Sequence, residues 1–306
     1  MSFFQKHKLL LAGFVTTLAL SGILIALFII NENIKEFIAA HRIATVSSFT
    51  PAAYPIFDMT IVPPLSALSA VVLDNDSKVL LFAKNADTAF IPASTTKLMT
   101  AMVGLDYFSL RDLLTVRSTD VSGSVIGLRS GEIFHFEDLL YAMLLPSAND
   151  AALTISQNYP GGEAVFISKM NEKADAIYLT HTRFVDPIGL SDQNYTTAKD
   201  LSRLASIAIR NKTLAAIVTT KHRDITDLNL GYTYSLISLN RLLGLYGVNG
   251  VKTGYTDEAG QVLITSKIEK GHTIIIVVMK SEDRFADTQK ILQAISNNIT
   301  YLSMHP

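Results

Sequence analysis

Residues 250–279 read GVKTGYTDEAGQVLITSKIEKGHTIIIVVM, and this stretch predicts three consecutive β-strands. Its apolar and β-branched runs are divided by two short turn sequences, DEAG at residues 257–260 and KG at residues 270–271. Strands this close together in the chain pair as an antiparallel meander. The expected strands are Gly250 to Tyr255, Gln261 to Lys267 and Thr273 to Met279.

The sequence upstream of the meander predicts a β-hairpin and then a long helical region. Ala67 to Leu73 and Val79 to Phe82 are strand-like runs that flank the turn cluster DNDS at residues 74–77. Helical spacing dominates from about residue 97 to about residue 245, and again after the meander. The expected helices include residues 136–145, 151–157, 164–178, 198–210 and 283–297.

This order of elements excludes an array of βαβ units, which would need strands and helices to alternate. We therefore expect an α/β (α+β) fold in which both chain ends build one antiparallel five-stranded sheet. The helical region is inserted between the early and late strands. A cleft between sheet and helices would bring together residues that lie far apart in the chain.

Composition excludes several classes of function. The chain has 306 residues, a formal net charge of −1 and no cysteine. The near-neutral charge and the lack of a dense basic stripe argue against a nucleic-acid partner. Neither disulfides nor thiolate metal sites are available, the seven histidines are scattered, and residues such as His135 and His181 are expected to be ordinary surface or core side chains. We expect neither a metal nor a cofactor.

The N-terminus predicts a membrane anchor. Residues 9–30 contain no charged side chain, and a helix of this length spans the hydrocarbon core of a bilayer. Lys6 and Lys8 precede the run, so residues 1–8 are expected on the cytoplasmic side and the rest of the chain outside. A cleaved signal peptide is the alternative, but the run is long and no Ala-x-Ala site follows it. Residues 31–63 read as a proline-containing stalk, and residues 64–306 as the folded domain.

Three short motifs together supply the groups that an acylating serine enzyme needs without histidine. They are STTK at residues 94–97, SAN at residues 147–149 and KTG at residues 252–254. Ser94 and Lys97 share one face of a predicted helix, so the amine can lie beside the hydroxyl. Lys97 can accept a proton only if burial, or a second cation such as Lys252, lowers its pKa.

The other two motifs are less specific. Ser-x-Asn also occurs at Ser156, Ser238 and Ser296, so flanking sequence must select the functional copy. Ser147 leaves an apolar helix at a turn, where it could cap the next helix or relay a proton. The third motif offers a cation, a hydroxyl and a backbone without Cβ bulk, which suit a substrate carboxylate and an extended peptide at a sheet edge.

With their flanks, these motifs resemble the serine D-alanyl-D-alanine carboxypeptidases, the low-molecular-mass penicillin-binding proteins. The resemblance runs from about residue 66 to about residue 295. It is carried by IPASTTKLMTA at residues 91–101, LLPSANDAA at residues 144–152 and GVKTGYT at residues 250–256. It implies a β-lactamase/transpeptidase-like fold, attack on the D-Ala-D-Ala end of peptidoglycan stem peptides, and covalent inhibition by β-lactam antibiotics. It also places the enzyme at the bacterial cytoplasmic membrane, with its domain outside.

The resemblance also implies a role for each site residue. Ser94 is the expected nucleophile, Lys97 its proton acceptor, and Ser147 assists proton transfer to the leaving D-alanine. Substrate binding is expected from Asn149, Lys252, Thr253, Gly254, Tyr255 and Arg284, with Thr253 and Arg284 at the terminal carboxylate. The oxyanion hole is expected from the backbone N–H groups of Ser94 and Tyr255.

The chain departs from the family pattern in two places. Residues 186–190 read DPIGL where the family often has NPHGL, so a loop near the cleft differs. Many relatives continue into a C-terminal β-domain and an amphipathic membrane helix, whereas only about fifty residues follow Lys252 here. The N-terminal helix is therefore the expected anchor.

Three other functions compete with this prediction. A D,D-endopeptidase that cuts cross-links would use the same motifs. A class A-like β-lactamase would need a glutamate for deacylation, and the region some thirty-odd residues past Asn149 holds Asp186 but no glutamate. A non-catalytic wall-binding protein could retain all three motifs.

Overall fold

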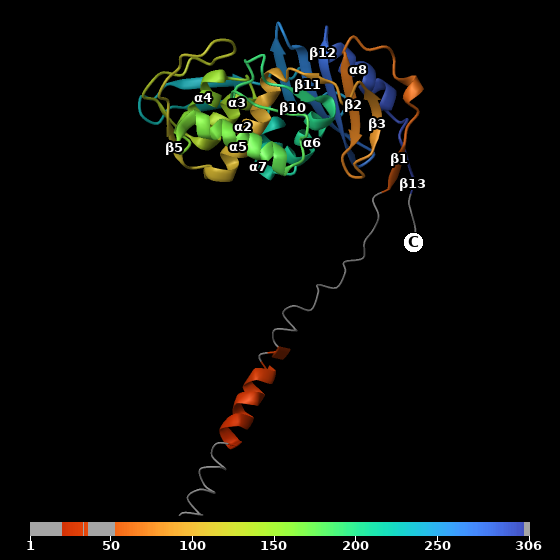
Figure 1. The fold of residues 1–306 in the computed structure, drawn as a ribbon. Helices are drawn as coiled ribbons and strands as arrows, with labels where there is room; N and C mark the ends of the chain where they lie inside the picture. The colour runs from red at the N-terminus through yellow and green to blue at the C-terminus, as the bar shows by residue number, and fades with distance from the viewer. Residues whose placement is uncertain (1–19, 33, 36–52, 303–306) are drawn as a thin grey trace, which may run out of the picture. The chain divides into compact units, whose positions relative to one another are not determined.

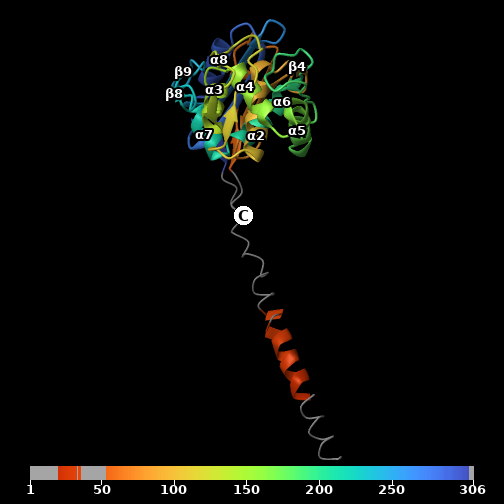
Figure 2. The same ribbon diagram turned by 90° about the vertical axis from the view of Figure 1, so that its left-hand side faces the viewer.

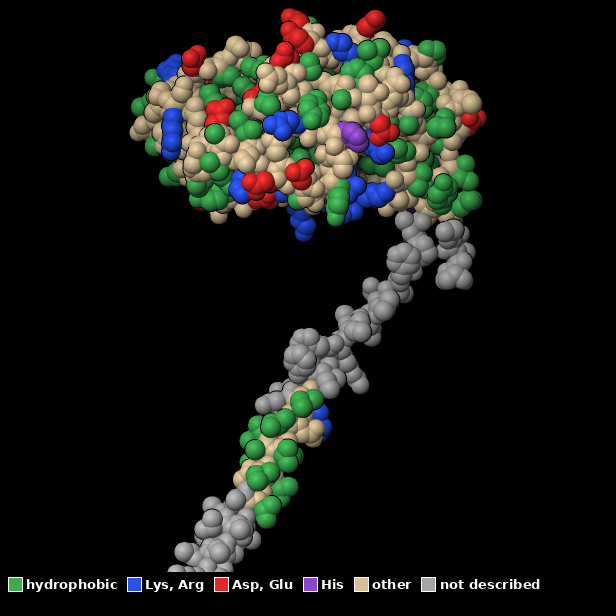
Figure 3. All heavy atoms as spheres, viewed as in Figure 1, with side chains coloured by type: hydrophobic (Ala, Val, Ile, Leu, Met, Phe, Trp, Pro, Cys, Tyr) green, Lys and Arg blue, Asp and Glu red, His purple; other side chains and the backbone are tan. Residues whose placement is uncertain are grey.

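The computed structural model describes residues 20–32, 34–35 and 53–302 of the chain. The chain divides into two compact units, residues 1–51 and residues 52–306. Residues 20–32 of the first unit are helical, and their side chains are almost all exposed. Hydrophobic side chains predominate along the part of this helix that Figure 3 draws. None of the helices in the described residues is long and apolar enough to cross a membrane, and half of the predicted 9–30 span lies outside those residues.

One five-stranded antiparallel sheet organises the second unit (Figure 1). Its strand order is β10-β11-β12-β2-β3, so the late meander and the early hairpin join through β12 and β2. The strands are β2 Ser69–Asp74, β3 Leu80–Lys84, β10 Val248–Thr256, β11 Gly260–Glu269 and β12 His272–Ser281. The predicted sheet from both chain ends is therefore confirmed.

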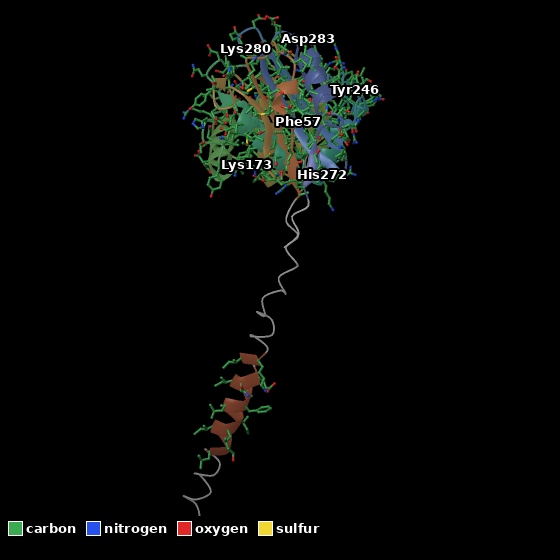
Figure 4. The ribbon with its side chains drawn as sticks, turned by 90° about the vertical axis from the view of Figure 1, so that its right-hand side faces the viewer. Phe57, Lys173, Tyr246, His272, Lys280 and Asp283 are labelled. Carbon is green, nitrogen blue, oxygen red and sulfur yellow. The ribbon has the colours of Figure 1, made fainter. Side chains whose placement is uncertain are left out.

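The sheet is buried on both faces, and alternate residues of one strand enter different cores. In β12, Ile275 and Val277 face a large core shared with the helical region. Ile274 and Ile276 face a second core beneath α8, Arg284–Ile295. Phe57, labelled in Figure 4, packs against this second core.

The inserted helices lie together beside the sheet (Figures 1 and 2). They begin and end close to the predicted positions. They are α2 Lys97–Tyr107, α3 Phe136–Leu144, α4 Asn149–Asn158, α5 Gly162–Ala176, α6 Ala198–Ala208 and α7 Lys212–Val218. A short 3-10 helix, η2 Ala93–Thr96, runs directly into α2. α6 packs on β2 and β12, which fixes the helical region against the sheet.

Several short strands were not predicted from the sequence, because each depends on a partner that local periodicity does not reveal. They are β1 Tyr54–Ile56, β4 Ala89–Phe90, β5 Leu113–Thr115, β6 Ile133–His135, β7 Thr196–Thr197, β8 His222–Thr226, β9 Thr233–Ile237 and β13 Thr300–Leu302. β1 pairs with β13, close to the C-terminus. Together with η1, Met59–Ile61, β1 gives regular structure to part of the segment that we expected to be a stalk.

Candidate active site

Ser94 lies on η2, at the entrance to the buried helix α2. The preceding residue, Ala93, has a left-handed backbone with φ of 49°. Such a conformation is costly for a residue with a side chain and is held only where the surroundings impose it. Ser94 itself is only half-buried, so its hydroxyl can be reached from solvent.

Lys97 is fully buried, one turn after Ser94. Its ammonium nitrogen donates to Ser94 Oγ over 2.9 Å and to the carbonyl oxygen of Ile188 over 2.7 Å. Burial lowers the pKa of Lys97 to about 7, because the charged form loses its hydration, and the carboxylates of Asp186 and Asp150 oppose part of that shift. Near neutral pH this amine therefore exists in both protonation states.

A second buried lysine, Lys252, contacts Ser147 of the SAN motif. Lys252 Nζ donates to Ser147 Oγ over 2.8 Å and to the carbonyl oxygen of Thr253 over 2.9 Å. Burial, and then repulsion from Lys97 and Arg284, lowers the pKa of Lys252 well below its ordinary value. Burial, and not the charge of Lys252, lowers the pKa of Lys97, whereas the charge of Lys97 does lower the pKa of Lys252.

Ser147 does not cap the following helix, which was one of the two interpretations of its position. The cap residue of α4 is Ala148, and it makes no side-chain capping bond. Ser147 is buried and has a left-handed backbone with φ of 65°. Its hydroxyl is directed to Lys252 instead, which leaves it available for proton transfer rather than for helix stabilisation.

β10 brings the third motif against the nucleophile. Gly254 needs to lack a side chain, because a Cβ there would lie 3.1 Å from Ala93 Cβ, from Pro92 O and from Ser94 N. Arg284, the first residue of α8, donates from Nη1 to Gly254 O over 2.7 Å and so holds this strand in place. β10 is an edge strand of the sheet, so one side of its backbone has no neighbouring strand.

The remaining predicted residues occupy different positions around these lysines. Asn149 is buried, its Nδ2 donates to Ser122 O over 2.6 Å, and its Oδ1 has no hydrogen-bond partner among the described residues. Thr253 is also buried. Tyr255 is 57% exposed, and its hydroxyl donates to Asp257.

The loop with the DPIGL sequence forms the floor beneath Lys97. Asp186 accepts from the backbone N–H groups of Ile188, Gly189 and Ser191, and so folds the loop into a tight turn. This turn presents the Ile188 carbonyl to Lys97. The loop was expected near the cleft, but its contact with Lys97 could not be predicted. The acceptor is a backbone carbonyl, which every residue type carries.

The other Ser-x-Asn copies lie elsewhere in the fold. Ser156 is buried within α4 and donates to Leu153 O, and Ser238 accepts from the backbone N–H of Asn240. Ser296 ends α8. Of the four copies, Ser147 is the one whose hydroxyl meets the lysine of the third motif.

Comparison with known protein families identifies the family to which this site belongs. The sequence profile described as peptidase S11, D-alanyl-D-alanine carboxypeptidase, matches residues 58–283, which is well over half of the chain. The chain belongs to the peptidase S11 family. It is therefore a serine hydrolase of the D-alanyl-D-alanine carboxypeptidase class.

Individual members of the S11 family agree with this assignment. The chain is 33% identical over 258 residues to a D-alanyl-D-alanine endopeptidase of Pseudomonas aeruginosa, covering 81% of this chain and 83% of that protein. It is 31% identical over 260 residues to the D-alanyl-D-alanine carboxypeptidase DacF of Bacillus subtilis, covering 80% of this chain and 66% of that protein. The crystal structure of the Streptomyces K15 DD-transpeptidase superposes with a TM-score of 0.72 at 31% identity, covering 76% of this chain and 97% of that one.

Gly189 offers a test of how tightly the S11 site is built. Its φ is +86°, and a Cβ there would lie 2.0 Å from Ala93 O and 2.8 Å from Thr96 Oγ1. Gly189→Ala should therefore displace the segment that carries Ser94, and we expect acylation by a fluorescent penicillin to slow by about 100-fold, as for a misplacement of about 1 Å.

Gly127→Ala is the matched control for this substitution. Gly127 has a similar φ of +83°, but no atom lies within 4 Å of the position of its Cβ. Gly127→Ala should lose only the free energy that a left-handed backbone costs an alanine, about 1–2 kcal/mol of stability, and its acylation rate should not change. Equal acylation rates in the two variants would contradict the packing of Gly189 against the Ser94 segment.

Proposed function

We propose that the protein removes the terminal D-alanine of peptidoglycan stem peptides through an acyl-enzyme on Ser94. The observation that carries this proposal is the contact of a fully buried lysine, Lys97, with Ser94 Oγ at 2.9 Å. A serine hydroxyl attacks a carbonyl only when a base lies within hydrogen-bond reach. With a pKa near 7, neutral Lys97 accepts the hydroxyl proton as Ser94 attacks the carbonyl carbon.

Ser147 and Lys252 are proposed to deliver a proton to the leaving D-alanine. Ser147 Oγ lies 2.8 Å from Lys252 Nζ, and both side chains are buried. The hydroxyl can give its proton to the departing amine and recover one from the ammonium group beside it. The lowered pKa of Lys252 favours this transfer, because burial and nearby cations destabilise its charged form.

The substrate is proposed to lie extended along the free edge of β10. A peptide at a sheet edge gains main-chain hydrogen bonds, and Gly254 lets β10 approach the Ser94 segment closely, which brings this edge to the nucleophile. The backbone N–H groups of Ser94 and Tyr255 would stabilise the oxyanion. Asn149 Oδ1, which is buried without a partner among the described residues, is suited to accept from an amide N–H of the acyl part.

The terminal carboxylate of the substrate is proposed to bind at Thr253 and Arg284. Arg284 reaches β10 from the start of α8 through its bond to Gly254 O. The Thr253 hydroxyl and the Arg284 guanidinium together favour a carboxylate over a neutral chain end.

Cleavage of cross-links is the second candidate activity. Relatives from Pseudomonas aeruginosa and Escherichia coli are named D-alanyl-D-alanine endopeptidases, and this chain is 33% and 31% identical to them. Both activities begin with the same acylation of Ser94 and differ in the group that leaves.

Release of free D-alanine from a muramyl pentapeptide is the experiment that tests the proposed function. We expect release by the full chain and none by Ser94→Ala, which should also lose covalent labelling by fluorescent penicillin. Release by the Ser94→Ala variant would contradict the nucleophile. Cleavage of a cross-linked muropeptide dimer without release from the pentapeptide would favour the endopeptidase.

The pH dependence of acylation tests the role of Lys97. Lys97 must be neutral to accept a proton, and its neutral fraction rises with pH through a pKa of about 7. The acylation rate constant should therefore rise about tenfold per pH unit below that value and level off above it. Penicillin labelling measured across this range checks the profile, with thermal unfolding at each pH as the control. A flat profile through pH 7 would contradict Lys97 as the base.

We further propose that residues 9–30 anchor the enzyme in the bacterial cytoplasmic membrane, with residues 1–8 inside. The support is the uncharged run and the lysines before it. Residues 31–63 would then link the anchor to the catalytic domain outside, at the level of the cell wall, where β-lactams also reach it.

Fractionation of cells that express the full chain tests this placement. The protein should sediment with membranes, resist extraction at alkaline pH, and lose its catalytic domain when protease is added outside spheroplasts. Recovery of the full-length chain in the soluble fraction would contradict the anchor.

A further inference from the structure

A cavity lies away from the active site, between α6 and the hairpin of β2 and β3. It has a volume of about 460 Å³, within the range of small-molecule sites. None of its lining residues belongs to the three motifs or to the loop beneath Lys97. Its apolar wall is formed by Leu73, Leu80 and Ile207.

The lining of this cavity is basic, although the chain as a whole carries a charge of −1. Lys78, Lys199, Arg203 and Arg210 line it, against the two carboxylates of Asp87 and Asp200. Both carboxylates are already engaged. Asp87 pairs with Lys199 at 3.0 Å, and Asp200 Oδ2 accepts from His181 N and Thr182 Oγ1.

Three cations of the cavity are left without a carboxylate. Among the described residues, no acidic oxygen lies within 4.0 Å of the charged nitrogens of Lys78, Arg203 or Arg210. Burial, and then repulsion from Arg210, lowers the pKa of Lys78, while Asp76 and Asp74 act in the opposite direction. Lys78 therefore lies close enough to Arg210 and Arg203 for their positive charges to repel it.

The geometry directs these cations to one place. Arg203 and Ser206 are three residues apart and share one face of α6, and Arg210 lies in the turn that directly follows this helix. Lys78 Nζ donates to Ser206 Oγ over 2.7 Å and to Asn75 Oδ1 over 3.0 Å, which holds it above that face. Arg203 donates from Nε to Ile177 O over 2.6 Å, and its guanidinium lies 5.4 Å from the centre of the Tyr178 ring, while its Nη atoms have no hydrogen-bond acceptor among the described residues.

We propose that this cavity binds a phosphate group through Lys78, Arg203 and Arg210. A phosphate has enough oxygens to accept from all three side chains at once, whereas a carboxylate has two. The apolar wall would cover the organic part of a small phosphate ester. The headgroup of an anionic lipid offers the same phosphate chemistry, and the experiment separates the two sources.

Binding is measured with the full chain by calorimetry, using inorganic phosphate and glycerol 3-phosphate, with acetate at matched ionic strength. Sedimentation with phosphatidylglycerol vesicles, compared with phosphatidylcholine vesicles, reports on the lipid source. Because the chain carries its N-terminal apolar run, only the part of vesicle binding that depends on Lys78 and Arg210 counts. Either source supports the site if binding depends on those residues.

Arg210→Gln and Lys78→Met should each weaken phosphate binding by about tenfold or more, the loss expected for one charge-assisted hydrogen bond. Lys212→Gln is the matched control. It removes the same charge from an exposed position just beyond Arg210, outside the cavity, and should bind as the parent does. Arg210 is exposed, and the hydrogen bond that it makes among the described contacts is from its backbone N–H to Ile207 O, so substitution of its side chain should leave the fold intact.

Three results would overturn the proposal. They are the absence of binding to every phosphate probe, equal binding of acetate, and equal affinities of Arg210→Gln and Lys212→Gln. Penicillin labelling of Ser94 is recorded on the same samples and should be unchanged in all variants. Loss of labelling would concern the active site, so failure of the two proposals can be told apart.

Discussion

The hydrogen bond between Lys97 and Ser94 is the interaction on which the rest of the site depends. Lys97 lies on the first turn of α2, in the part of the helix that is buried, so it loses its hydration and its charged form becomes costly. Only the Ile188 carbonyl and Ser94 Oγ lie within hydrogen-bond reach of its nitrogen among the described residues. The surroundings thus hold the amine close to its neutral form near pH 7, with the carboxylates of Asp150 and Asp186 limiting the shift.

The five-stranded sheet holds β10 against the segment that carries Ser94 and Lys97. β10 contributes Lys252 and Gly254, and both need close contact with residues about 100 or more positions earlier. Pairing of β12 with β2 joins the two ends of the chain, and α8 then supplies Arg284 to the back of β10. The left-handed backbones of Ala93 and Ser147, which flank the site, are tolerated because this packing holds them.

Much of this organisation could be predicted from the sequence. Strand and helix periods located the five-stranded sheet and the main inserted helices, and the three motifs named residues that the fold brings within hydrogen-bond distance, Ser94 with Lys97 and Ser147 with Lys252. Long-range backbone partners could not be predicted. The pairing of β1 with β13 and the Ile188 carbonyl under Lys97 depend on tertiary contacts that no local pattern encodes. The cavity beside α6 could not be predicted for the same reason, since Lys78 and Arg210 are far apart in the sequence and line one cavity only in the folded chain.

The proposed mechanism requires Lys97 to be a buried amine that loses its proton near neutral pH. It can be tested directly by NMR titration of the full chain with ¹³C at the lysine Cε positions, with Lys97→Met and Lys252→Met variants to assign the two buried signals. We expect the Lys97 signal to titrate with a pKa of about 7, well below the value of about 10.4 for a lysine in a model peptide. A Lys97 signal that titrates near that model value would contradict this expectation.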